Sequence, residues 1–199
     1  MTNFYKNKRQ IINWLEKHKV KSYTLVPDEQ YIFIVNVTGA VYLSNKDLTN
    51  IPVKFNEVNG DFYCNHNQLT SLEFCPQKVD GNFSCSHNQL TSLEFCPQAV
   101  TGIFYCSDNQ LTSLEFCPQT VGEKFYCHDN QLTSLEFCPQ TVGEKFYCKN
   151  NPGLKEIQEI TDFKLILLEH KKLLATNLSN KLENELINDN SKKTAKIKI

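Results

Sequence analysis

In the middle of the chain, apolar and small residues alternate with polar ones over short stretches, and the same stretch returns at a fixed interval. In residues 79–85 every second position is apolar or small, which is typical of a strand with one buried face. An identical eleven-residue string, Asn-Gln-Leu-Thr-Ser-Leu-Glu-Phe-Cys-Pro-Gln, begins at Asn67, Asn88, Asn109 and Asn130. This period of 21 residues predicts a solenoid, in which each unit buries its apolar face against its neighbours.

A weaker copy of the unit begins near residue 37, so we expect the repeat array to cover residues 37–154. Residues 4–19 have a helical pattern, and short strands are expected at 23–26 and 31–35. Beyond the array, helices are expected at 162–175 and 178–187. Terminal units expose a core edge, which an amphipathic helix can cover. The predicted organisation is an N-terminal cap (1–36), the array (37–154), a C-terminal helical cap (155–187) and a basic, disordered tail (188–199).

The repeated unit resembles a known family. Phe-Tyr-Cys-Xaa-Xaa-Asn-Gln-Leu-Thr-Ser-Leu is similar to the L-x-L-x-x-N-x-L core of the leucine-rich repeat, and the short period resembles its bacterial and bacteriophage subclass. The resemblance implies a right-handed horseshoe with a parallel sheet on its concave face and irregular or extended backbone on its convex side. Together with the helical patterns at the two ends, the predicted fold class is an α/β repeat solenoid with helical caps at both ends. The chain departs from the consensus in placing Phe and Cys where Leu is usual, and Lys46 where the first unit would carry Asn.

Charge is distributed unevenly along the chain. The 21 basic and 22 acidic side chains give a net charge of -1, but residues 37–151 hold 6 basic and 12 acidic side chains. The near-zero net charge argues against a dedicated polyanion binder, and it conceals an acidic middle between basic ends. No apolar run approaches the roughly 20 residues of a membrane span. The N-terminus has no apolar stretch typical of a secretory signal, so we expect a cytoplasmic protein without membrane contact.

Nine cysteines lie between residues 64 and 148, at alternating gaps of 11 and 10. Stacked repeats place equivalent side chains in rows, and rows do not converge on a point as four thiolate ligands of zinc must. An odd number of thiols cannot all pair in disulfides. We therefore expect reduced, buried thiols that pack as small apolar side chains.

Three rows of polar side chains recur with the repeat. We expect the Asn row to satisfy backbone groups at the turn after each strand. The Glu row is expected to be a solvated edge, with cation binding or phosphate mimicry as the alternative. A His and Asp row suggests metal or acid–base chemistry. No nucleophile or oxyanion donor accompanies the His and Asp row, so we expect no enzyme activity, metal or cofactor. The two remaining histidines, His18 and His170, are expected to be solvated. The rows are Asn67, Asn88, Asn109, Asn130 and Asn151; Glu73, Glu94, Glu115 and Glu136; and His66, His87, Asp108 and Asp129, with His128 adjacent.

The positions that point outward from the strands vary between units, whereas the connecting arc does not. Tyr dominates the central column, and it presents rigid, amphipathic area that is enriched at protein interfaces. The alternative is that an exposed Tyr is simply a good strand former. On one side of a parallel sheet, these columns would form a continuous surface of roughly 20–25 Å. The predicted partner-binding residues are Asp61, Tyr63, Asn65, Ile103, Tyr105, Lys124, Tyr126, His128, Lys145, Tyr147 and Lys149.

The sequence therefore predicts a non-enzymatic module that docks a protein partner on its concave face, by steric occupation or as a scaffold, and that takes no small-molecule substrate. Repeats of this short type often occur in phage and mobile-element genomes, so the resemblance implies an inhibitor of a host or defence protein such as a CRISPR effector. The alternative is a nucleic-acid-related role, through acidic mimicry by the Glu row or RNA contact by Lys124, Lys145, Lys149 and the tail.

Overall fold

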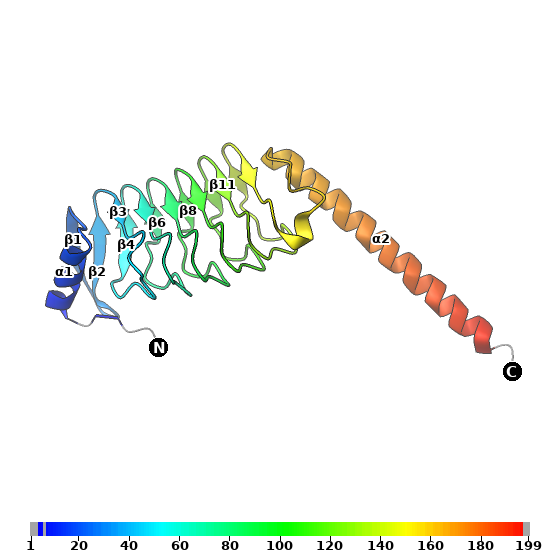
Figure 1. Cartoon of the computed structure of the whole chain (residues 1–199), viewed down its shortest axis with the longest axis horizontal. Coiled ribbons are helices and arrows are strands. Elements are labelled where there is room, and N and C mark those ends of the chain that lie inside the picture. The colour runs from blue at the N-terminus through cyan, green and yellow to red at the C-terminus, as the bar shows by residue number, and fades with distance from the viewer. Residues whose placement is uncertain (1–3, 6, 197–199) are drawn as a thin grey trace.

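The chain forms a parallel-strand β-solenoid of about five turns, from which a long C-terminal helix projects (Figure 1). The computed structural model describes residues 4–5 and 7–196, with side chains described as far as residue 185. Two sheets run along the solenoid. One contains β1 (Tyr23–Asp28), β2 (Ile32–Val37), β4 (Phe55–Val58), β6 (Lys78–Val79), β8 (Ala99–Val100), β10 (Thr120–Val121) and β12 (Thr141–Val142). The other contains β3 (Val41–Tyr42), β5 (Phe62–Tyr63), β7 (Phe83–Ser84), β9 (Phe104–Tyr105), β11 (Phe125–Tyr126) and β13 (Phe146–Tyr147).

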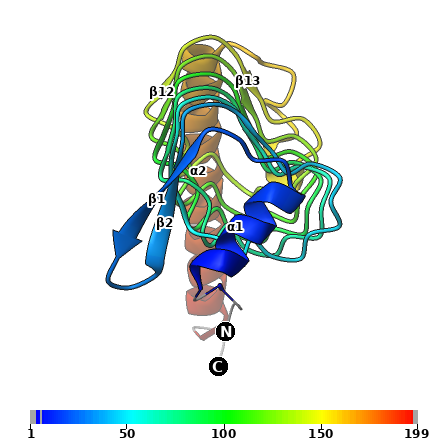
Figure 2. The ribbon, with the colours of Figure 1, turned by 90° about the vertical axis from the view of Figure 1, so that its left-hand side faces the viewer.

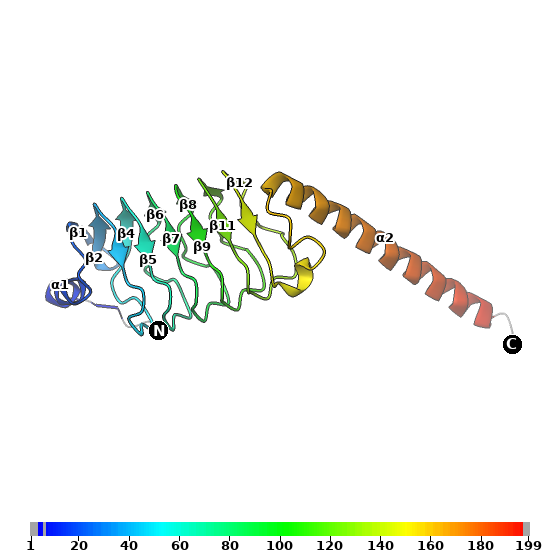
Figure 3. The same cartoon turned by 45° about the horizontal axis from the view of Figure 1, so that its top comes forward.

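Each full turn contributes one short strand to each sheet, and equivalent strands pair in parallel with neighbours one repeat away (Figure 3). The expected parallel sheet and the irregular return arc are both present, since residues 85–98 contain no strand, but the second sheet was not expected. The expected strand over residues 79–85 is split, because Val79 ends β6 and Phe83 begins β7. At the corner between them, a Cβ on Gly81 would lie 2.7 Å from the carbonyl carbon of Gly60, so neighbouring turns leave no room for a side chain.

The core is a ladder of phenylalanines flanked by leucines, valines and cysteines. In-register pairing stacks Phe104 between Phe83 and Phe125, with ring centroids 5.5 and 5.1 Å apart. These rings are fully buried, so each turn packs its apolar face on the next. The ladder comprises Phe62, Phe83, Phe104, Phe125 and Phe146.

The Asn row satisfies backbone groups, as the sequence predicted. The Asn109 Nδ2 donates to the carbonyl oxygens of Cys85, Cys106 and Ser107 at 3.1, 3.2 and 3.1 Å. Its Oδ1 accepts a hydrogen bond from the Leu90 N–H at 3.0 Å. One amide therefore ties two turns together at the point where the chain leaves the six-stranded sheet.

All nine cysteines are free thiols; eight are buried and Cys138 is half-buried. Burial raises the pKa of Cys138 to about 11 and that of Cys148 to about 12, so both thiols are protonated at neutral pH. The Cys106 Sγ donates to the Tyr126 carbonyl oxygen on the next turn at 3.3 Å. The prediction that the cysteines pack as small apolar side chains is confirmed for the eight buried ones.

The N-terminal segment folds over the first turns of the solenoid (Figure 2). Helix α1 (Lys8–Lys17) begins after Asn7, whose Oδ1 accepts from the Arg9 N–H at 2.8 Å. Its apolar face buries Ile11, Trp14 and Leu15, and the Trp14 ring packs 6.3 Å from that of Phe55. The antiparallel hairpin β1–β2 follows, in agreement with the two strands expected there.

At the other end, the 3-10 turn η1 (Pro152–Leu154) leads to helix α2 (Phe163–Lys196). Phe163 and Ile166 are buried, and the Phe163 ring lies 5.5 Å from Phe146, the last rung of the core ladder. The His170 Nε2 accepts from the Leu135 N–H at 3.1 Å, and burial lowers the pKa of His170, which favours the neutral ring that this bond requires.

At both ends of the chain, the structure differs from what the sequence predicted. His18 and His170 are buried rather than solvated, because each imidazole meets a backbone group, the Trp14 carbonyl and the Leu135 N–H respectively. Helix α2 is continuous where two helices were expected, since residues 176–177 include no helix breaker. Helix α2 runs on to Lys196, so residues 188–196 of the expected disordered tail are helical, and residues 197–199 lie outside the described residues.

Candidate functional site

The outward face of the six-stranded sheet carries a tyrosine ladder, formed by Tyr42, Tyr63, Tyr105, Tyr126 and Tyr147. Tyr126 stacks between Tyr105 and Tyr147, with ring centroids 4.9 and 4.5 Å apart and rings within 8° of parallel. Tyr42 and Tyr63 stack at 5.7 Å. Tyr42 was missed from the sequence, although its place directly after Val41 matches that of Tyr63 after Phe62.

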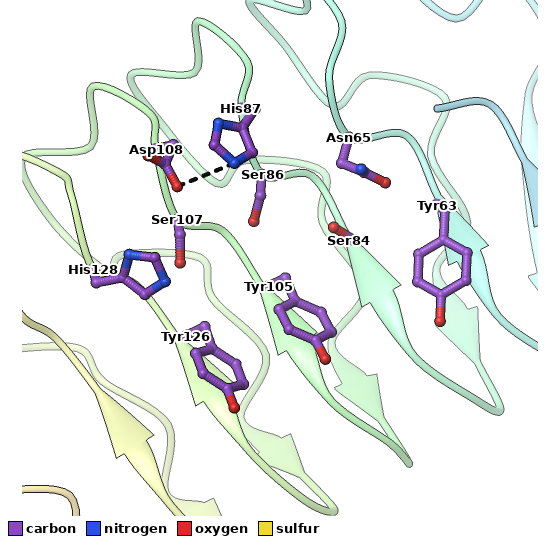
Figure 4. Close-up of a pocket in the computed structure, with 10 residues that line it drawn as sticks. All are labelled: Tyr63, Asn65, Ser84, Ser86, His87, Tyr105, Ser107, Asp108, Tyr126 and His128. Carbon is purple, nitrogen blue, oxygen red and sulfur yellow. Dashed lines mark ion pairs between the residues drawn. The ribbon is translucent and has the colours of Figure 1, made fainter. Parts of the chain in front are cut away.

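Ser84 interrupts the ladder. Strand β7 pairs with β5 and β9 in register, so Ser84 occupies the rung between Tyr63 and Tyr105 (Figure 4). A cavity of about 460 Å³ opens over this position. Five of the predicted partner-binding residues line it: Tyr63, Asn65, Tyr105, Tyr126 and His128. Five further residues line it that were not among the predicted partner-binding residues: Ser84, Ser86, His87, Ser107 and Asp108.

Two buried hydroxyl groups line the cavity without a hydrogen-bond partner among the described residues. Ser86 is 8% exposed and Ser107 is 3% exposed, and the Oγ of each is unpaired. An unpaired buried hydroxyl costs about 1–3 kcal/mol. Both serines stand at the offset of Asn65 and His128, so their column was visible in the sequence; their burial was not. The two unpaired hydroxyls are therefore candidate contacts for a ligand in the cavity.

Imidazole and carboxylate groups form one rim of the cavity. The His87 Nε2 lies 3.4 Å from the Asp108 Oδ2, and the His128 Nδ1 lies 2.6 Å from the Asp129 Oδ2. Hydrogen bonds from Asn150 and then His128 hold the pKa of Asp129 below its ordinary value. Ligand atoms of Asp108, His128 and Asp129 all lie within 4.8 Å of one another, so these are the described side chains that could hold a divalent metal ion. The absence of a metal from the protein's function stays a prediction.

Asp61 and Ile103 lie in the column beside the ladder, outside the residues that line the cavity. The Asp61 Oδ1 accepts from the Asn82 N–H at 2.7 Å, and the Asn82 Oδ1 accepts from the Ile103 N–H at 2.8 Å. These polar side chains therefore connect successive turns at the corner.

The predicted basic residues lie toward the C-terminal end of the ladder. Lys124 pairs with Glu144 at 3.5 Å, and Lys149 pairs with Glu159 at 3.1 Å. Lys145 is exposed and forms an isolated backbone bridge with Asp162. Two of the three cations thus have an acidic neighbour, which reduces the positive charge that they offer to a partner.

A second exposed row, of Phe95, Phe116 and Phe137, was not foreseen. These side chains are 42%, 47% and 55% exposed, and their φ angles of 69°, 67° and 63° lie in the left-handed region that bulky residues rarely adopt. Phe74 has the same backbone conformation but is 2% exposed, because the rings of Phe4 and Tyr31 cover it at 5.7 and 5.6 Å. The Glu row precedes these phenylalanines in sequence, and Glu94, Glu115 and Glu136 are exposed.

The local geometry around Phe116 predicts an unusual order of stabilities. Glycine carries no Cβ penalty at positive φ, so we expect Phe116→Gly to be more stable than Phe116→Ala by about 1 kcal/mol. Exposed Thr112, whose φ is not positive, is the control: Thr112→Ala should be at least as stable as Thr112→Gly. Urea denaturation of the four variants measures both differences. The same order at both positions would contradict the left-handed conformation of Phe116.

Comparison with known proteins assigns no family to the chain. Within the part of the chain that the structure describes, no helix is both long enough and apolar enough to cross a membrane. No protein-family model, no curated protein and no solved structure matches the sequence or the fold.

Proposed function

We propose that this protein is a non-enzymatic binding module of the leucine-rich repeat type that docks a protein partner on the tyrosine ladder. The observation that carries the proposal is the stacked row of half-exposed Tyr rings beside an open cavity with unpaired polar groups. Protein interfaces favour such rigid, amphipathic side chains, because little conformational entropy is lost when they are covered.

The sheet behind the ladder supports this role. Six strands spaced by about 4.8 Å give a face roughly 24 Å long, enough for a helix or the edge of a domain. Each Tyr is followed and preceded in its strand by residues that enter the core, such as Phe104 and Cys106 around Tyr105, so the rings stand on a rigid base. A preorganised surface of this kind loses less conformational entropy on binding.

The helical ends fit the same module. We include in the proposal that α1 and the first turns of α2 act as caps, since α1 covers Phe55 through Trp14 and α2 covers Phe146 through Phe163. Each helix shields an end of the apolar ladder that would otherwise face water. The class of partner that we propose is a host or defence protein, and the mode of action is steric occupation of that partner or scaffolding.

The charges around the predicted basic residues support a nucleic-acid-related role less well than they support protein docking. An RNA-binding role for Lys124 and Lys149 would have to disrupt their pairs with Glu144 and Glu159. Fluorescence anisotropy with bulk RNA and DNA at low salt tests this role directly, since phosphate contacts strengthen as salt falls. Absence of binding at low salt would remove direct contact as an explanation.

A variant comparison tests the docking face. We expect Tyr105→Ala plus Tyr126→Ala to reduce recovery of a specific partner from host lysate by about tenfold or more, because aromatic anchors dominate interface energies. Glu94→Ala plus Glu115→Ala is the matched control on the other exposed row and should retain the partner. Quantitative mass spectrometry of the captured proteins measures both, and circular dichroism confirms the fold. Equal recovery by the native and Tyr variants would refute the proposal, and selective loss in the Glu variant would move the interface to the Glu row.

A further inference from the structure

The interruption of the ladder points to the chemistry of the partner. We propose that the rung left vacant by Ser84 receives an arginine side chain of the partner protein, stacked between Tyr63 and Tyr105. This inference rests on the proposed function, because it concerns the same face, but it makes a separate prediction about a single side chain.

The rung has the dimensions of one planar group. Neighbouring strands are about 4.8 Å apart, so Tyr63 and Tyr105 stand two spacings, or about 9.6 Å, from each other. A flat group at the position of Ser84 would lie about 4.8 Å from each ring, which is close to the 4.9 Å between Tyr105 and Tyr126. Figure 4 shows that no other labelled ring occupies this gap.

The polar lining selects arginine among planar side chains. The unpaired Oγ atoms of Ser86 and Ser107 can accept hydrogen bonds, and the Asp108 carboxylate lies on the rim of the same cavity. A guanidinium group supplies five N–H donors, a positive charge and a flat face that stacks on Tyr. A phenyl ring would fill the rung but leave both hydroxyls unpaired, and a lysine ammonium would not stack as a plane.

The surrounding charge agrees with a cationic occupant. Residues 37–151 carry twice as many acidic as basic side chains, and Asp129 stands one turn from Asp108. Of the two histidines at the rim, His87 is already beside Asp108 and His128 beside Asp129. The field at the cavity therefore favours a cation over a carboxylate or a phosphate.

Blocked tripeptides provide the test. We expect acetyl-Gly-Arg-Gly-amide to bind the native protein in saturation-transfer NMR, with citrulline and lysine analogues binding more weakly, since citrulline lacks the charge and lysine lacks the plane. Ser84→Tyr fills the rung with the residue found at the equivalent position of five other strands, and should weaken arginine-peptide binding about tenfold or more. Ser84→Ala leaves the rung open and is the matched control.

The outcomes separate this inference from the proposed function. Binding that is equal for the three peptides, or unchanged in Ser84→Tyr, would overturn the arginine site. If Ser84→Tyr still captures a partner that Tyr105→Ala plus Tyr126→Ala loses, the docking face stands and the arginine site falls. If the arginine peptide binds the native protein and not Ser84→Tyr, the site stands even where the Tyr variant retains every lysate partner.

Helix α2 carries a second feature, an exposed segment over residues 174–185. From residue 174 to residue 185 every side chain is exposed, including Leu174, Leu178 and Leu182 at 49%, 59% and 51%. Leucines four residues apart form one row along a helix. A helix without packing is marginal in water, so this row needs a cover. We infer that its cover is the same row of a second copy, paired antiparallel about a two-fold axis at Leu178.

The charges along the row determine the direction of pairing. Lys171 precedes Leu178 by seven residues and Glu185 follows it by seven, so both lie close to the leucine row. Antiparallel pairing about Leu178 places Leu174 opposite Leu182 of the second copy and Lys171 opposite its Glu185. Parallel pairing would place Lys171 opposite Lys171 and Glu185 opposite Glu185. Because α2 projects away from the solenoid, antiparallel pairing leaves the two solenoids at opposite ends (Figure 1).

Charge reversal tests the pairing in the full chain. We expect sedimentation equilibrium to show a dimer that dissociates on dilution, and Lys171→Glu or Glu185→Lys alone to weaken it about tenfold, since like charges would then face each other. The double variant Lys171→Glu plus Glu185→Lys restores both pairs and should restore the dimer. A monomer at about 100 μM, single variants that dimerise like the native chain, or a double variant weaker than the singles would overturn the inference.

Discussion

Replacing Phe104 with alanine is expected to lower the free energy of unfolding by about 3–5 kcal/mol. The ring is fully buried and stacks between Phe83 and Phe125 at 5.5 and 5.1 Å. Both neighbours are themselves rungs of the core ladder, so the cavity left by the ring cannot collapse without moving two turns. Urea denaturation followed by circular dichroism measures the loss.

Phe116→Ala is the matched control, because it removes the same type of side chain from a surface position. There, 47% of the phenylalanine is exposed. Less apolar area is returned to water there, and no internal cavity forms, so the loss should be clearly smaller than at Phe104. Equal losses in the two variants would mean that Phe104 does not lie in the core. A reduced slope of the transition in Phe104→Ala would show that the array no longer unfolds as one unit.

Most of the fold could be predicted from the 21-residue period of the sequence. Because a 21-residue repeat stacks equivalent positions, the sequence alone identified the buried columns, such as Phe104 and Cys106, and the backbone role of Asn109. The second sheet was not predictable in the same way. Val79 and Phe83 both point into the core, although they lie on either side of a corner. The alternation of buried and exposed positions therefore continues through the bend at Gly81, and the sequence does not reveal the bend.

The site was predicted in part, and the missed residues share a physical reason. Outward tyrosines such as Tyr105 could be found by their recurrence, and they do stand side by side. Ser84, Ser86 and Ser107 stand in columns that the sequence shows. The cavity over Ser84 and the burial of the unpaired hydroxyls of Ser86 and Ser107, however, depend on how the neighbouring turns stack. His170 illustrates the same limit, because its partner Leu135 lies 35 positions earlier in the chain.

Replacing Asn130 with alanine is the second change expected to have a large effect, with a loss of about 3 kcal/mol, because several backbone groups lose a partner at once. The Nδ2 of this buried side chain donates to the carbonyl oxygens of Cys106, Cys127 and His128 at 3.0, 3.2 and 3.3 Å. Its Oδ1 accepts from the Leu111 N–H at 3.0 Å.

The adjacent exposed residue provides the control, and an isosteric variant tests the mechanism. Gln131→Ala should change the free energy of unfolding by less than about 0.5 kcal/mol, because its side chain is exposed. Asn130→Asp keeps the acceptor for Leu111 but turns a carboxylate toward three carbonyl oxygens, so it should not rescue stability at neutral pH. Protonation of that carboxyl restores one donor, so its deficit should shrink as the pH falls, whereas the deficit of Asn130→Ala should not. If urea denaturation at pH 7 and pH 4.5 gave parallel deficits, the donor role of Asn130 would be wrong, and the row would stabilise the solenoid by packing alone.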